Sequence, residues 1–232
     1  MSRGVIFKKG ETINLVVPDT ACLETMISWT EMINDQDVTR YIGQGIFPQS
    51  VNAQRSYVSD ILDSRSRLCL VIKANESDKF LGVISLSDID LINRRAQLST
   101  VCPYKCETAR YAALQARALL SDHAFRKMGL SSVYSYQAYP ENKRWAQASE
   151  AIGYLPSGFS LYSYAYDGSL THRLIISLSR QQYFDLSREH DSLWPSSKVI
   201  AERLSKLNGR ISKAEELFSL VSKQSQNSSW EA

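Results

Sequence analysis

Two pairs of side chains stand where they could move protons. Tyr134 and Tyr136 alternate in a strand-like run, so both point to the same face of that strand. Asp88 and Asp90 follow the end of an earlier strand-like run. A phenol or a carboxylate placed beside a reacting group can act as a general acid or base. Ring packing for the tyrosines and a turn for the aspartates explain the same residues without chemistry, and both interpretations stay open.

The histidines and cysteines lack the spacing of a metal site. His123 lies inside a predicted helix, His172 in a predicted hairpin and His190 in a polar connector. The four cysteines contain no CxxC pair, which structural zinc sites commonly use. We therefore predict no metal site, and we interpret His123 as a packed side chain on an apolar helix.

The residues that could do chemistry are set among alternating helical and strand-like segments. In chain order we predict helices at 20–42 and 50–62, strands at 68–73, 80–86 and 96–102, a central helix at 108–127, a strand at 132–138, a helix at 142–152 and strands at 159–166 and 174–178. Ser50 is the expected cap of the second helix, and Gly129 and Gly153 follow the ends of two later ones. This order predicts an α+β (mixed α/β) domain.

The chain is expected to divide into a domain over residues 1–183 and a connector with a helical extension over residues 184–232. Within the extension, residues 197–223 have apolar side chains at alternating spacings of four and three, as in a coiled-coil seam. The seam consists of Ile200, Leu204, Leu207, Ile211, Ala214, Phe218 and Val221. Gly209 interrupts it. Either the parent domain covers this face, or a second copy or a partner protein does.

Composition narrows the range of partners. The 232 residues include 27 Lys and Arg against 24 Asp and Glu, so the net charge of +3 does not indicate a nucleic-acid or membrane partner. No apolar stretch approaches the roughly 20 residues that span a bilayer. The polar first residues lack the apolar core of a signal peptide, so a cytoplasmic location is expected.

Three segments carry a family resemblance. Residues 140–154, PENKRWAQASEAIGY, are similar to the pattern P-E-N-x-x-S-x-x-x-x-E-x-x-G-F. Upstream, INRRAQLSTVC is similar to N-R-x-A-E-L-G, and LLSDHAFRKMGLSSVY to D-Y-A-F-x-x-L-G-L-x-x-V. In this order and at these separations, residues 13–183 resemble the GNAT superfamily of acyl-CoA N-acyltransferases, and within it the branch that acetylates ribosomal-protein N-termini. The resemblance implies a three-layer fold whose central, largely antiparallel sheet is splayed, with helices on both faces.

The resemblance also implies a site for acetyl-CoA. The pantetheine arm would lie along the strand at 96–102, and the N-terminus of the next helix would face the pyrophosphate, because its free amides and dipole suit an anion. The cofactor-binding residues carried over are Val101, Cys102, Pro103, Thr108, Arg110, Tyr111, Ala112, Ala113 and Asn142. Arg110 would add a cation to the phosphate-facing turn.

Several positions depart from the family pattern. Tyr111 replaces a glycine of the phosphate-facing turn, where a Cβ has little room, and it argues against ordinary acetyl-CoA binding. Gln97 stands where relatives often have a glutamate base, and Trp145 replaces a serine. Ser149 occupies the position of a tyrosine that protonates the thiolate in many relatives. The candidate catalytic residues are therefore Ser149 and Tyr136.

Two functions follow from these observations. The first is an acetyl-CoA-dependent N-acetyltransferase that acts on a primary amine of a small molecule or a protein N-terminus. The alternative is a catalytically inactive GNAT-fold domain that serves as a structural or binding subunit through its C-terminal helix. The turn at residues 108–113 discriminates between them, because only an enzyme needs it to accept phosphates.

Overall fold

The computed structural model describes residues 4–40, 47–103, 111–166 and 168–227. These residues form one eight-stranded sheet in the order β1-β2-β3-β4-β5-β6-β8-β7. The strands are β1 (Ile6–Lys9), β2 (Ile13–Val16), β3 (Leu68–Ala74), β4 (Phe80–Asp90), β5 (Arg95–Val101), β6 (Ser132–Tyr139), β7 (Leu155–Tyr166) and β8 (Ser169–Ser179). All neighbours are antiparallel except β5 and β6, which are parallel and are joined through a crossover helix. The predicted mixed α/β class is confirmed.

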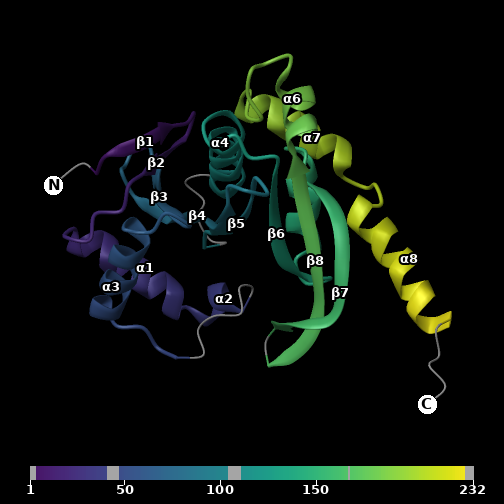
Figure 1. Cartoon of the computed structure of the whole chain (residues 1–232), viewed down its shortest axis with the longest axis horizontal. Coiled ribbons are helices and arrows are strands. Elements are labelled where there is room, and N and C mark those ends of the chain that lie inside the picture. Colours follow the sequence, from purple (N-terminus) through teal and green to yellow (C-terminus); the bar gives the residue numbers. More distant parts are fainter. Residues whose placement is uncertain (1–3, 41–46, 104–110, 167, 228–232) are drawn as a thin grey trace.

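Helices cover both faces of the sheet, which gives the predicted three layers (Figure 1). The helices are α1 (Leu23–Asn34), α2 (Gln36–Thr39), α3 (Val51–Leu62), α4 (Ala112–Arg126), α5 (Lys143–Glu150), α6 (Arg180–Ser187), α7 (Ser197–Leu207) and α8 (Lys213–Asn227). The helices α1 and α3 share a small core with one side of β3 and β4, while α4 packs in the main core on the other side. None of the helices in the described ranges is long and apolar enough to cross a membrane.

The sheet opens between β5 and β6. They pair only where Arg95–Gln97 lies beside Ser132–Tyr134, although β5 continues to Val101 and β6 to Tyr139. Figure 1 shows β6, β8 and β7 turning away from the first five strands. The predicted splay is therefore confirmed, and it leaves backbone groups of both strands without a partner in the ladder.

Local sequence explains most helix starts. The Ser50 hydroxyl accepts a hydrogen bond from the Ala53 amide at 3.2 Å, which confirms it as the cap of α3. Ser179 and Gln182 form a reciprocal capping box at the start of α6. The short strands β1 and β2 and the helix α6 were not predicted, because segments of four and eight residues show too little periodicity.

The extension is not one helix, so the prediction of a continuous helix over residues 197–223 is wrong. The helix α7 ends at Leu207, Gly209 has a φ of +75°, and α8 begins at Lys213. Glycine adopts this left-handed conformation at little cost, and a helix cannot continue through it. The break gives α7 and α8 independent directions against the domain.

The parent domain covers much of the apolar seam. Ile200 of α7 and Ala214 of α8 are fully buried in the main core, as are Leu193 and Trp194 of the connector. Phe218 packs against the rings of Tyr139 and Phe159 at centroid distances of 5.1 and 5.2 Å. Ile211, in contrast, is 71% exposed. The extension therefore docks on its own domain, and a role of residues 197–223 in assembly stays a prediction.

Candidate functional site

The diverging strands present different surfaces to the two sides of the sheet. Ala96 and Leu98 of β5 and Val133 of β6 are buried in the core that α4 shares, and we call this side the α4 face. The opposite side, against which α1 and α3 pack, is the α1 face. Because side chains alternate along a strand, Tyr134 and Tyr136 lie on the α1 face.

Unpaired polar groups mark the α4 face of the splay. Thr100 on β5 and Gln137 on β6 share this face, and both lie beyond the last pair that the two strands form. The Thr100 Oγ1 and both polar atoms of the Gln137 amide are buried, and none has a hydrogen-bond partner within the described residues. Buried polar groups are rarely left in this state, because each loses its bonds to water. These atoms would be satisfied by a polar chain lying in the splay.

The exit of β5 holds three of the predicted cofactor residues. Val101 is the last residue of β5, and the Cys102 thiol donates to the Leu81 carbonyl at 2.9 Å. Pro103 follows directly. Gly82 has a φ of +150°, and a Cβ there would lie 2.2 Å from the Val101 carbonyl oxygen. Only glycine lets β4 approach so closely, and this contact fixes the end of β5 beside the opening.

The predicted phosphate-facing turn is described only in part. Thr108 and Arg110 lie outside the described residues. Tyr111 caps α4, and its ring centroid is 6.3 Å from that of Trp194 in the connector. The half-buried ring thus packs toward the extension. Ala112 and Ala113 form the first turn of α4, where backbone amides are free of helical acceptors.

The two predicted residues of α5 differ in access. Asn142 is the N-cap of α5 and is half-buried, and its side chain makes no capping hydrogen bond. Ser149 is fully buried, and its hydroxyl donates to the Trp145 carbonyl at 2.8 Å. The Trp145 ring lies 5.8 Å from the guanidinium of Arg117 on α4. The structure therefore places the Ser149 hydroxyl inside the helix and commits it to the backbone.

The two tyrosines are neighbours on the α1 face. The ring centroids of Tyr134 and Tyr136 are 5.5 Å apart, and Tyr136 lies just past the end of the β5–β6 pairing. Burial raises the pKa of Tyr134, and the nearby Tyr136 and Asp88 raise it further. The Gln97 amide, also on this face, donates to the Ser99 hydroxyl at 3.3 Å. The phenols of both tyrosines thus form a polar pair beside the opening.

Arg173 belongs to the same surface, although it was not predicted. It lies on β8 opposite Ala138, and its guanidinium carbon is 5.2 Å from the Tyr136 ring and 5.8 Å from the Tyr164 ring. A β-bulge between Ser160 and Tyr164 of β7 places the Ser163 carbonyl 2.9 Å from the Arg173 Nη2. The one signal in the sequence was an arginine within the otherwise apolar run of β8.

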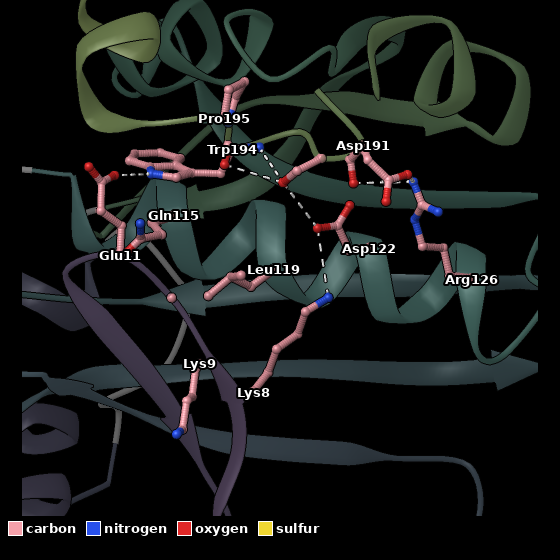
Figure 2. Close-up of a pocket in the computed structure, with 12 residues that line it drawn as sticks. Lys8, Lys9, Glu11, Gln115, Leu119, Asp122, Arg126, Asp191, Trp194 and Pro195 are labelled. Atoms are coloured by element: carbon pink, nitrogen blue, oxygen red, sulfur yellow. Dashed lines mark hydrogen bonds and ion pairs between the residues drawn. The ribbon is translucent and has the colours of Figure 1, made fainter. Parts of the chain in front are cut away.

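A separate pocket of about 410 Å³ lies between the tip of the β1–β2 hairpin, α4 and the connector (Figure 2). The Glu11 carboxylate accepts hydrogen bonds from the Trp194 indole at 2.9 Å and from the Ser197 amide at 2.7 Å, so it caps α7. Gln115 of α4 accepts from the backbone amides of Thr12 and Ile13. None of the described residues that line this pocket comes from β5 or β6. Its polar contacts fasten the hairpin and the connector to α4.

Solved structures share this fold. The spermidine N-acetyltransferase of Vibrio cholerae, in complex with CoA and spermine, is 15% identical with a TM-score of 0.66, covering 75% of this chain and 99% of that one. A structure from T. thermophilus, assigned to the acetyltransferases by inference, is 20% identical with a TM-score of 0.61, covering 89% and 99%. No curated protein sequence matches this chain significantly.

The family model for the acetyltransferase (GNAT) domain matches residues 21–155, which run from the start of α1 to the start of β7. The match contains the splayed strands β5 and β6, the crossover helix α4 and the helix α5 that follows them. It therefore spans every element that borders the opening except β8 and β7. The chain belongs to the GNAT acetyltransferase family.

Proposed function

We propose that this protein is an acetyl-CoA-dependent N-acetyltransferase that acts on a primary amine. The observation that carries the proposal is the pair of unsatisfied side chains, Thr100 and Gln137, on the α4 face of the splay. Their buried oxygen and amide atoms suit the hydroxyl and amide groups of a pantetheine arm. The free backbone edges of β5 and β6 add further donors and acceptors.

The remaining predicted residues would hold the rest of the molecule. The first-turn amides of Ala112 and Ala113 suit the pyrophosphate, and the Asn142 side chain borders the same face from α5. Since the Tyr111 ring packs toward Trp194, its side chain need not lie over these amides. When bound, acetyl-CoA supplies an acetyl group activated as a thioester.

The chain's own residues move the protons from the α1 face. Tyr136 holds a proton at its phenol oxygen beside the opening and can release it to the departing sulfur. The raised pKa of Tyr134 keeps that phenol protonated at neutral pH, so it can relay a proton from the acceptor amine back to Tyr136. Gln97 cannot act as a base, and we assign it to orientation. Ser149 stays a prediction, because its hydroxyl would first have to leave the Trp145 carbonyl.

Comparison with relatives supports an amine acceptor, since a structural neighbour acetylates spermidine. The ribosomal-protein branch, a protein N-terminal acceptor and a cytoplasmic location stay predictions. The alternative of an inactive binding subunit rested on an uncovered apolar seam. Because the parent domain buries Ile200 and Ala214 of that seam, this alternative has lost its main support.

The test compares two identical substitutions. Thiol release from acetyl-CoA is followed with a panel of primary amines for Tyr136→Phe and for the control Tyr162→Phe, whose side chain is 67% exposed. Loss of an acid–base group should lower kcat by roughly 100-fold or more in the first variant only. A Tyr136→Phe enzyme with full kcat would remove Tyr136 from the proton path.

A further inference from the structure

The α1 face beside the opening carries a row of polar side chains across four strands. Asp88 of β4, Gln97 of β5, Tyr134 and Tyr136 of β6 and Arg173 of β8 follow one another in the order of the sheet. Ser87, the neighbour of Asp88, pairs with Gln97, and Gln97 pairs with Tyr134. The row therefore has a carboxylate at one end and a guanidinium at the other, with the two phenols between them.

The charge of Arg173 has no counterpart in the part of the chain that the structure describes. No carboxylate of the described residues lies within 4 Å of its guanidinium, which packs between the rings of Tyr136 and Tyr164. Its Nε is buried and lacks a hydrogen-bond partner among these residues, while the Nη2 donates to the Ser163 carbonyl. A half-buried arginine held by two aromatic rings is rigid, and its planar fork suits a carboxylate or phosphate.

The carboxylate at the other end is also available. Asp88 is exposed and sits at a bulge with a φ of +48°, where β4 and β5 lose register. Its near neighbour Asp90 is instead committed to Asn93, through bonds from the Asn93 amide at 2.8 Å and side chain at 2.6 Å. Asp88 is thus the acidic group of the row that remains open to a ligand ammonium.

This arrangement favours one class of acceptor over another. A polyamine carries positive charge along its length, so one of its ammonium groups would face Arg173 and be repelled. An acceptor with both signs of charge would instead place its amino group toward Asp88 and the tyrosines and its anion toward Arg173. Resting on the proposed function, we infer that the acceptor is a small primary amine that also carries a carboxylate or phosphate, and that Arg173 selects it.

The test measures kcat/KM for acceptors that differ only in this charge. Free L-amino acids are compared with their α-carboxamides, O-phosphoethanolamine with ethanolamine, and spermidine is included as the polycation. Wild type should prefer the anionic member of at least one pair by roughly tenfold or more, since hydrogen bonds to a charged group are strong. The two pairs show whether a carboxylate or a phosphate is recognised.

Arg173→Gln should lower kcat/KM for the preferred anionic acceptor by roughly 10- to 100-fold and change that of its uncharged partner by less than about threefold. Arg188→Gln is the matched control, because it removes the same charge from a 76% exposed side chain on the distant helix α6. Thermal unfolding of both variants confirms that they are folded.

The outcomes separate the two proposals. Calorimetric binding of acetyl-CoA with an equal or greater rate for spermidine or the carboxamides would overturn the acceptor inference and leave the proposed function intact. If no acceptor is acetylated, titration of the same acceptors into the CoA-bound protein replaces the rates, and binding without preference for the anion overturns the inference. Failure to bind acetyl-CoA would overturn the proposed function, and the acceptor inference with it.

Discussion

Replacing Ile200 with alanine tests whether the extension is part of the domain. Ile200 is fully buried in the main core, whereas Ile211 in the same extension is 71% exposed. Truncation of a buried isoleucine to alanine costs about 2–5 kcal/mol, because apolar contacts are lost and a cavity remains. For a chain of 232 residues this lowers Tm by roughly 4–20 °C.

Ile211→Ala is the matched control, since it makes the same chemical change outside the core. Differential scanning calorimetry should show the large loss for Ile200→Ala and a change within about 0.5 kcal/mol for Ile211→Ala. Light scattering of the same samples reports the mass. Equal, small shifts in Tm together with a lower mass for Ile211→Ala would refute docking on the parent domain and favour assembly through the seam.

Two further perturbations examine the contacts around α4. Hydrogen bonds from Trp194 and Ser197 lower the pKa of Glu11 below its usual 4.5, so the carboxylate stabilises the fold above that pH, and the contribution is lost as pH falls through the lowered pKa. Glu11→Gln should therefore lose about 1 kcal/mol at pH 7 and show a shallower fall of Tm between pH 5 and 3 than wild type; equal slopes would contradict the capping role. Arg117 is fully buried, stacks 4.0 Å from the Tyr154 ring and has two nitrogens without partners in the described residues, so Arg117→Met should leave the free energy of unfolding unchanged or raise it by about 1–4 kcal/mol in urea titrations, whereas a clear loss would show that ring stacking outweighs desolvation.

The architecture could be predicted because its signals are local. Apolar periodicity located β3, β4, β5, α4 and β6, and the segment at residues 140–154 identified the family that the domain model matches. The break at Gly209 was visible as a glycine, but its consequence was not, since the direction of α8 depends on packing against Tyr139 and Phe159. Such contacts join residues far apart in the chain.

The site could be predicted only in part for the same reason. Alternation placed Tyr134 and Tyr136 on one face, and the structure brings them together. It could not show that the Ser149 hydroxyl is bonded to the Trp145 carbonyl. Arg173 reaches Tyr136 because β8 pairs with β6, and a bulge in β7 supplies its carbonyl partner. Pairing and bulges depend on three-dimensional context that one strand's sequence does not encode.

Binding of acetyl-CoA to the splay is the central claim, and isothermal titration of the wild type and Gln137→Leu tests it most directly. The leucine removes an unsatisfied buried amide, so the variant should be at least as stable as wild type, yet it should bind acetyl-CoA roughly tenfold more weakly. Gln181→Leu, an exposed change on α6, should bind like wild type. One-to-one binding by the wild type with this selective loss is the predicted result, whereas no binding, or equal affinity in Gln137→Leu, would contradict the account.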